Sequence, residues 1–171
     1  VRFAEAKKLS ILVLGGGSNM LIGAGGFSGL VIKIEIKGVV FKDEQVTVGA
    51  GEMWDELVQN LVTRNLWGAE NLSLIPGTTG GAAVQNIGAY GVEAREIIFS
   101  VEAFDIETMQ TKIFLCSECA FGYRESIFKK NKNLIVTRVV FTLARNGVPR
   151  TDYEDVKKYF DEREITTPTH K

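Results

Sequence analysis

The sequence lacks the features that mark several classes of protein. Its 20 Lys and Arg residues balance 21 Asp and Glu residues, so it has no basic excess of the kind that nucleic acids and membrane surfaces usually require. No apolar run approaches the roughly 20 residues of a transmembrane helix. The first residues, VRFA, contain neither an initiator Met nor a signal peptide. We therefore expect a cytoplasmic protein that binds neither nucleic acid nor a membrane.

Cysteine and histidine are also scarce. Cys116 and Cys119 are the only cysteines, so the chain has no disulfide framework and a reducing compartment is expected. Their C-x-x-C spacing is found in zinc sites, but a structural zinc ion needs four ligands and the one histidine is His170 in the tail. A redox pair would need a thioredoxin-like context, which is absent. We expect no metal site and no redox role at these cysteines.

Apolar patterning predicts more strands than helices. Strands are expected at residues 9–14, 30–36, 45–48, 97–105, 111–115 and 134–143, and helices at residues 52–66 and 153–164. Helix 52–66 repeats apolar side chains at helical spacing, with Glu52 favouring its start and Gly68 its end. The helices are interspersed irregularly, which favours an α+β fold over a regular βαβ array. The length suits one domain, or two small lobes that share a cofactor.

The first of two glycine-rich stretches, Gly15-Gly16-Gly17-Ser18-Asn19, follows the first expected strand directly. Consecutive glycines let backbone N–H groups converge on an anion such as a pyrophosphate. A dinucleotide-binding Rossmann motif would use Glu35 as its ribose-binding acid. However, Met20 occupies the third glycine position, and the glycines at 23, 25 and 26 would break the helix that must follow. The stretch is therefore a phosphate loop of another kind, or a glycine-rich turn without a ligand.

The second stretch, IPGTTGGAAVQNIGAYG at residues 75–91, carries no charge. A surface loop of this length is normally charged and solvated. Small neutral residues favour a backbone that packs closely over a flat, uncharged ring system. The alternative is a tightly packed interior turn.

A third motif, FGYRES at residues 121–126, follows a turn glycine with Tyr123 and Arg124. The guanidinium of an arginine suits a carboxylate or an enolate, because it donates two parallel hydrogen bonds and keeps its charge. Arg124 is therefore a candidate catalytic cation. From its residue type alone, however, an arginine at a turn is usually just a surface charge.

Together, the segments GGGSNML, ENLSLIPGTTGGAAVQNIGAYGVE and FGYRESIFK resemble the UDP-N-acetylenolpyruvoylglucosamine reductases, also called UDP-N-acetylmuramate dehydrogenases. The resemblance runs in the family's order across residues 9–153. It implies an α+β, two-lobed FAD-binding domain of the vanillyl-alcohol-oxidase (PCMH) type, with FAD in the groove between the lobes. Residues 1–35 would be the remainder of an incomplete first lobe and residues 36–149 the second lobe. Residues 150–171 would form a tyrosine-bearing loop and the start of a linker to a substrate-binding domain.

The resemblance also implies roles for individual residues. Gly15, Gly16, Gly17, Ser18 and Asn19 would hold the FAD pyrophosphate, and Asn86, Ile87, Gly88 and Gly91 would pass near the isoalloxazine. The other residues expected to contact FAD are Met20, Pro76, Gly77, Gly80, Gly81, Ala82 and Ile135. Arg124 would polarise the enolpyruvyl carboxylate while the flavin delivers hydride to the adjacent alkene carbon, where a fixed cation lowers the barrier. Tyr123 would line the substrate site. Tyr153 would bind the substrate diphosphate, although its local sequence also suits an ordinary tyrosine at a helix start.

The implied reaction is the FAD-dependent reduction of UDP-N-acetylglucosamine enolpyruvate to UDP-N-acetylmuramate with NADPH, for peptidoglycan synthesis, by a monomeric enzyme. The sequence itself does not distinguish NADPH from NADH. The family's proton-donor serine, its C-terminal glutamate and the opening strand and helix of its first lobe have no counterpart in these residues. We therefore expect this chain to correspond to part of a full-length enzyme and to lack full turnover alone.

Two other functions stay open. The chain could belong to another flavin oxidase of the same fold that acts on an alcohol or a sugar. Many such oxidases tether flavin to a histidine, and neither glycine-rich stretch has a histidine nearby. It could also be a non-catalytic remnant that holds FAD or a UDP-sugar without chemistry.

Overall fold

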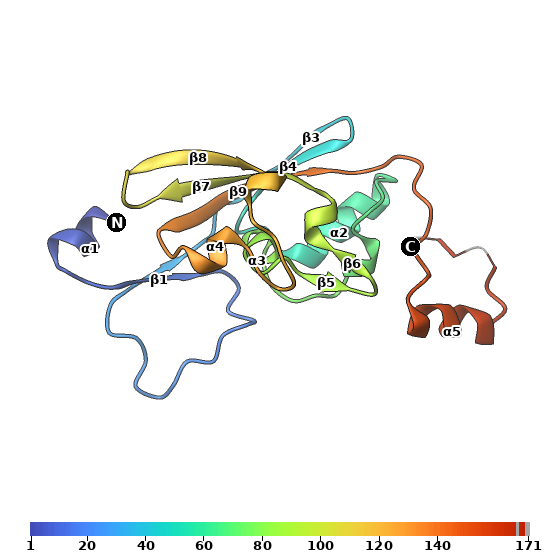
Figure 1. The fold of residues 1–171 in the computed structure, drawn as a ribbon, viewed down its shortest axis with the longest axis horizontal. Helices are drawn as coiled ribbons and strands as arrows, with labels where there is room; N and C mark the ends of the chain where they lie inside the picture. Colours follow the sequence, from blue (N-terminus) through green and yellow to red (C-terminus); the bar gives the residue numbers. More distant parts are fainter. Residues whose placement is uncertain (167, 170–171) are drawn as a thin grey trace.

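A computed structural model describes residues 1–166 and 168–169 of the chain. Its centre is an antiparallel five-stranded sheet in the order β3-β4-β9-β7-β8 (Figure 1). The strands are β3 (Val39–Lys42), β4 (Gln45–Gly49), β7 (Ile98–Asp105), β8 (Gln110–Leu115) and β9 (Leu134–Thr142). β9 holds the central position because its β-branched and aromatic side chains, including Val136, Val139 and Phe141, are buried in the core.

Ahead of this sheet, helix α1 (Arg2–Ala6) leads into β1 (Ile11–Leu14), which pairs in parallel with β2 (Leu30–Lys33). An extended segment, residues 15–29, connects the two strands and projects from the molecule (Figure 1). The chain then passes from β2 to β3 close against residues 49–51. A Cβ atom on Gly49 would lie 2.4 Å from the Ile36 carbonyl oxygen, so only glycine permits this approach.

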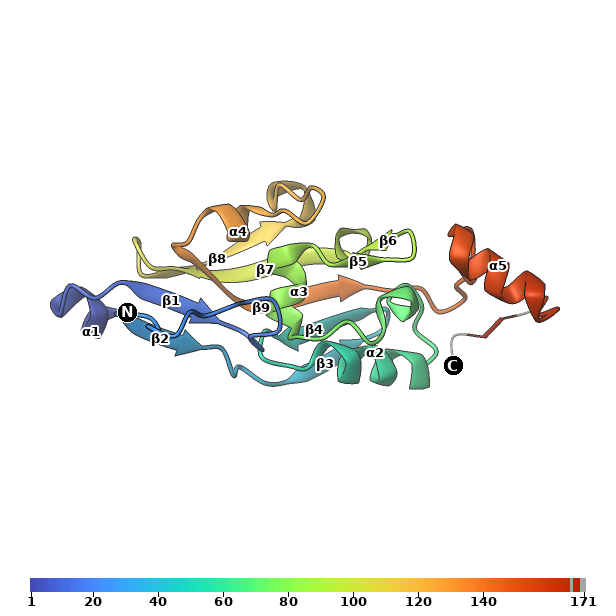
Figure 2. The same ribbon diagram turned by 90° about the horizontal axis from the view of Figure 1, so that it is seen from below.

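Three helices cover one side of the five-stranded sheet: α2 (Trp54–Thr63), α3 (Thr79–Gln85) and α4 (Ile127–Lys130) (Figures 1 and 2). The Trp54 side chain of α2 is buried, its Nε1 donates to the Leu72 carbonyl at 2.7 Å, and its ring lies 5.9 Å from that of Phe141. Short strands β5 (Gly88–Ala89) and β6 (Val92–Glu93) form a separate hairpin. Helix α5 (Glu154–Glu162) lies at the opposite end of the molecule from α1. Three single 3₁₀ turns span Glu70–Leu72, Ala94–Glu96 and Cys116–Glu118.

The second glycine-rich stretch is not one continuous loop, contrary to the sequence-based expectation. Helix α3 occupies its middle, with the Thr78 hydroxyl capping the N-terminus by accepting from the Gly81 N–H at 3.4 Å. Glycine is a poor helix former, but a Cβ atom on Gly80 would lie 2.8 Å from the Cβ of Ala50. The small residues therefore let α3 pack closely on the sheet, as in the alternative of a tightly packed interior segment.

The α+β class is confirmed, and all of the expected strands and helices form. Their ends differ in places: α2 begins at Trp54 rather than at Glu52, because Met53 is extended and the Glu52 carbonyl accepts from the Thr79 N–H at 2.8 Å. Helices α1, α3 and α4 and strands β3, β5 and β6 were not predicted. The tail region 150–171 is described except for residues 167, 170 and 171, so His170 lies outside the described residues. The division into lobes at residues 35 and 149 stays a prediction.

Candidate flavin and substrate site

The two glycine-rich stretches meet in space. The Ser18 hydroxyl donates to the Pro76 carbonyl at 3.2 Å, and the Asn19 amide donates to Gln85 Oε1 at 3.0 Å. Pro76 precedes α3 and Gln85 ends it. The first stretch therefore contacts the segment just before α3 and the last residue of α3.

Close packing of the two backbones accounts for several of the glycines. A Cβ atom on Gly15 would lie 2.9 Å from Thr78 Oγ1, and one on Gly16 would lie 3.3 Å from the Gly77 Cα. Gly77 has a φ of +125°, which side-chain-bearing residues rarely adopt. These glycines thus serve the contact between the stretches, whether or not a ligand is bound.

The backbone N–H groups of the two stretches differ in their availability. At the start of α3, the Thr79, Gly80 and Gly81 N–H groups donate to Glu52 O, Ala50 O and Thr78 Oγ1 at 2.8, 2.9 and 3.4 Å. In contrast, the N–H groups of residues 16–19 donate to no other residue in the described part of the chain. These four residues are exposed, and Gly17 adopts a left-handed φ of +76°. Four successive donors are therefore left for an anion in the first stretch.

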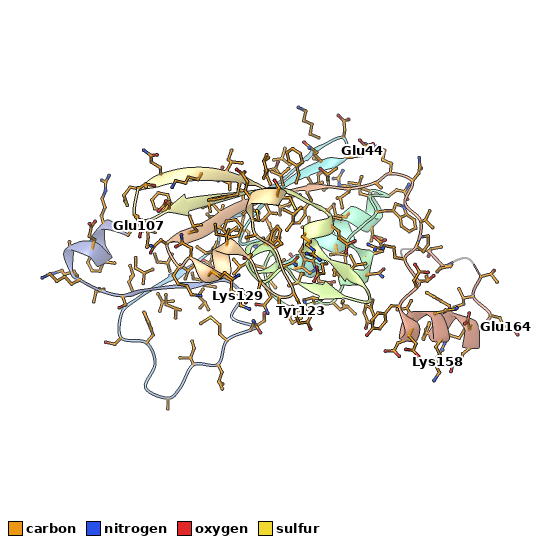
Figure 3. All side chains as sticks on the ribbon, in the orientation of Figure 1. Glu44, Glu107, Tyr123, Lys129, Lys158 and Glu164 are labelled. Carbon is orange, nitrogen blue, oxygen red and sulfur yellow. The ribbon has the colours of Figure 1, made fainter. Side chains whose placement is uncertain are left out.

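The third motif forms a tight turn. The Gly122 N–H donates to the Glu125 carbonyl at 3.0 Å, and the Glu125 N–H donates back to the Gly122 carbonyl at 3.1 Å. Tyr123 and Arg124 occupy the tip, and the Tyr123 side chain is 83% exposed. Figure 3 shows Tyr123 on the same edge of the molecule as Lys129 of α4, away from α5. The turn therefore exposes the Tyr123 side chain, whereas Arg124 is half-buried.

The turn also directs Arg124 toward the second stretch. Its Nη2 donates to the Gly88 carbonyl at 2.5 Å, and the Lys129 ammonium donates to the Arg124 carbonyl at 2.7 Å. Arg124 has a left-handed φ of +54°. The structure thus brings the predicted catalytic cation next to Gly88, one of the residues expected near the flavin ring.

Tyr153 likewise lies against the second stretch. The centroid of its ring is 5.8 Å from that of Tyr90 in an edge-to-face arrangement. A Cβ atom on Gly91 would lie 4.0 Å from Cδ2 of the Tyr153 ring. The Asn71 amide supports this arrangement by donating to the Tyr90 carbonyl at 3.3 Å and to the Arg150 carbonyl at 2.9 Å. Sequence reasoning missed Tyr90 and Asn71. An aromatic residue between two glycines was the available signal for Tyr90.

The remaining FAD candidates have varied surroundings. Ile87 and Ala82 are buried in the main apolar cluster, whereas Met20 and Pro76 are exposed. Ile135 is buried in β9 but is not a member of that cluster in the described structure. Its proximity to FAD stays a prediction.

The thiols of the two cysteines have raised pKa values. Burial raises the pKa of the Cys119 thiol to about 12, and burial also raises the pKa of the Cys116 thiol. Protonated thiols are weak nucleophiles and weak metal ligands.

Within residues 1–166 and 168–169 there is no group of three or more His, Cys, Asp or Glu residues arranged to hold a metal ion. The same residues include no helix of the length and apolar character needed to cross a membrane.

Comparison with known families gives a match for residues 1–109, to the family described as the FAD binding domain. The chain belongs to this family. The FAD-binding fold expected from the motifs is thereby confirmed. A solved structure, the UDP-N-acetylenolpyruvylglucosamine reductase of Thermus caldophilus, superposes with a TM-score of 0.69 at 27% identity, covering 98% of this chain and 60% of that one. The 6-hydroxy-D-nicotine oxidase of Arthrobacter nicotinovorans shares the fold at a TM-score of 0.61 and 19% identity, covering 83% of this chain and 32% of that one.

The curated relatives are named as members of the family that the three motifs resemble. The UDP-N-acetylenolpyruvoylglucosamine reductase of Pseudomonas savastanoi pv. phaseolicola is 42% identical over 167 residues, covering 94% of this chain and 49% of that protein. The UDP-N-acetylenolpyruvoylglucosamine reductase of Neisseria meningitidis serogroup C is 43% identical over 163 residues, covering 91% of this chain and 47% of that protein. The resemblance is confirmed, and this chain spans about half the length of these relatives.

Proposed function

We propose that this chain forms the FAD-binding part of a UDP-N-acetylenolpyruvoylglucosamine reductase. The reaction would be the reduction of UDP-N-acetylglucosamine enolpyruvate to UDP-N-acetylmuramate with NADPH, in peptidoglycan synthesis, by a monomeric cytoplasmic enzyme. The observation that carries the proposal is the meeting of all three motifs at α3. Ser18 and Asn19 reach the residues at its two ends, and Arg124 reaches Gly88 just beyond it.

The first stretch is suited to the diphosphate of FAD. Residues 16–19 offer four successive exposed N–H groups that no described residue accepts from, and converging N–H groups of this kind bind anions. The left-handed φ of Gly17 places successive N–H groups on one side of the backbone. Residues 79–82 would then contribute packing surface rather than N–H donors, because their N–H groups are used within the fold.

Arg124 is suited to the carboxylate of the enolpyruvyl group. Of its five N–H donors, the structure engages Nη2 with the Gly88 carbonyl, which leaves a fork available for a planar anion. Bound flavin supplies hydride in this reaction. Arg124 would hold the carboxylate and stabilise the negative charge that develops on it, because a fixed cation needs no reorganisation.

Two tyrosines would complete the substrate side. Tyr123 stands exposed beside Arg124, at 5.8 Å from the guanidinium to the ring centroid. Tyr153 would bind the substrate diphosphate through its hydroxyl while Tyr90 fixes its ring from the side. Residues 1–35 and 36–149 would be the two lobes, with Tyr153 in the segment that leads to a substrate-binding domain. Because the relatives are about twice as long, we expect turnover to need residues beyond these 171.

A flavin reduction and reoxidation experiment tests this proposal on a version extended to the length of the relatives. NADPH should bleach bound FAD without oxygen, and UDP-N-acetylglucosamine enolpyruvate should restore its absorbance. Reoxidation by oxygen alone would support a flavin oxidase. Absence of any reduction would support a non-catalytic remnant.

A further inference from the structure

Asn86 ends helix α3 in a conformation that few residues accept. Its φ and ψ are +43° and 63°, and its side chain is fully buried. Asparagine tolerates the left-handed region better than most residues, because its short polar side chain bonds locally. A glycine would satisfy the same backbone angles without burying a polar side chain. The side chain therefore has a purpose of its own.

Both ends of the Asn86 amide bind protein. Its Nδ2 donates to the Gly122 carbonyl at 2.8 Å, and its Oδ1 accepts from the Arg95 N–H at 3.0 Å. A buried amide satisfied in this way faces the fold rather than a ligand. Contact between Asn86 and a flavin ring would have to be made by the backbone.

The partner of Asn86 is the first residue of the turn that carries Arg124. That turn is strained, because Arg124 has a left-handed φ of +54°, and such a conformation persists only when its surroundings hold it. A second hydrogen bond supports the other end of the turn. The hydroxyl of Ser126, which follows the last residue of the turn, donates to the Val84 carbonyl of α3 at 2.6 Å. Asn86 and Ser126 thus fasten the two ends of the turn to the C-terminal part of α3.

We propose that Asn86 is a positioning residue, which fixes the Gly122–Glu125 turn so that the Arg124 guanidinium faces Gly88. The catalytic use of Arg124 rests on the proposed function above. The fastening of the turn does not, because it depends only on contacts within the chain.

Asn86→Asp is the most selective variant. Aspartate keeps the size, the tolerance of positive φ and the oxygen that accepts from Arg95. It loses the donor to Gly122 and sets a carboxylate against that carbonyl. Asn71→Asp is the matched control, because it makes the same chemical change at an amide that donates to Tyr90 and Arg150 instead.

Site-resolved proteolysis of the flavin-free chain measures the fastening directly. Trypsin cleaves after arginine, and the turn must open before it can cut between Arg124 and Glu125. The rate there is followed by mass spectrometry, relative to the cut after Arg163 at the exposed end of α5. We expect Asn86→Asp to raise the relative rate about tenfold, as the loss of a buried hydrogen bond implies, and Asn71→Asp to leave it unchanged. An unchanged relative rate in Asn86→Asp, or an equal rise at both sites, would overturn the proposal.

Hydrogen exchange in the unmodified chain gives a second measurement that does not depend on how a variant folds. The Arg95 N–H is held by Asn86 Oδ1 and the Glu125 N–H by the turn itself, so both should be strongly protected. Fast exchange at both would overturn the proposal. Because no flavin or substrate is used, a fastened turn in an inactive reductase would count against the proposed function alone.

Discussion

The Arg124 guanidinium donates a hydrogen bond to the Gly88 carbonyl across 36 residues of sequence. This contact joins the FGYRES turn to the end of the second glycine-rich stretch. It places a permanent cation beside a segment whose small, uncharged residues suit a flat ring. In the proposed function, a flavin and a carboxylate-bearing substrate would meet next to this fixed charge.

Replacing Arg124 by lysine tests that charge. Lysine keeps the charge but loses the planar fork, so we expect kcat of the extended reductase to fall at least about a hundredfold while FAD stays bound. Arg64→Lys is the control, because Arg64 lies over the Phe41 ring, away from the three motifs. Near-normal turnover in Arg124→Lys would exclude its catalytic role.

Two neighbouring glycines of α3 should respond in opposite ways to alanine. In Gly80→Ala, the new methyl would lie 2.8 Å from the Ala50 Cβ, so we expect destabilisation of about 1 to 3 kcal/mol from overpacking. In Gly81→Ala, it would lie 3.5 Å from Thr78 Oγ1, an ordinary contact. Gly81→Ala should raise stability by about 0.5 to 1 kcal/mol, through reduced freedom of the unfolded chain. Denaturant unfolding measures both, and equal effects would refute the close packing of α3 on the sheet.

Asp105 should make stability depend on acid. The hydrogen bond from the Lys112 ammonium, at 2.6 Å, lowers the Asp105 pKa from 3.8 to about 2, with help from the N–H groups of Glu107 and Thr108. A carboxyl with a lowered pKa in the folded state stabilises the fold above its ordinary pKa. That contribution is lost as the pH falls from about 4 through about 2.

Asp105→Asn should therefore be less stable at neutral pH and lose less stability between pH 4 and pH 2 than the unmodified chain. Thermal unfolding over this pH range measures the difference. Asp155→Asn, at an exposed position on α5, is the control. A parallel pH dependence in Asp105→Asn and the unmodified chain would contradict the assignment.

Local patterns in the sequence were enough to predict much of the fold. β9 and α2 could be placed because their apolar residues repeat at the period of a strand and of a helix. α3 could not, because Thr79, Gly80 and Gly81 are poor helix formers, and it forms only where the sheet offers a close-packing surface. β3 was missed because its four residues stand alone, whereas the equally short β2 was predicted from a longer alternating segment, residues 30–36.

The candidate site shows the same division between local and distant information. The turn that carries Arg124 could be predicted from Gly122 and the residues that follow it. The contacts that assemble the site were not, because they join residues far apart in the sequence. Asn19 meets Gln85 across 66 residues and Asn86 meets Gly122 across 36. No local period or motif encodes such a pairing.

The most direct test of the account is a flavin titration of the chain and two charge-insertion variants. Gly17→Asp places a carboxylate among the free N–H groups of residues 16–19, where the FAD diphosphate would lie. Gly23→Asp adds the same charge farther along the same segment, at a glycine with no atom within 4 Å of an added Cβ. Absorbance and fluorescence quenching should show that the unmodified chain and Gly23→Asp bind FAD in preference to FMN, while Gly17→Asp does not bind FAD. Equal FAD affinity in Gly17→Asp and the unmodified chain would contradict the assignment of the first glycine-rich stretch as the diphosphate site.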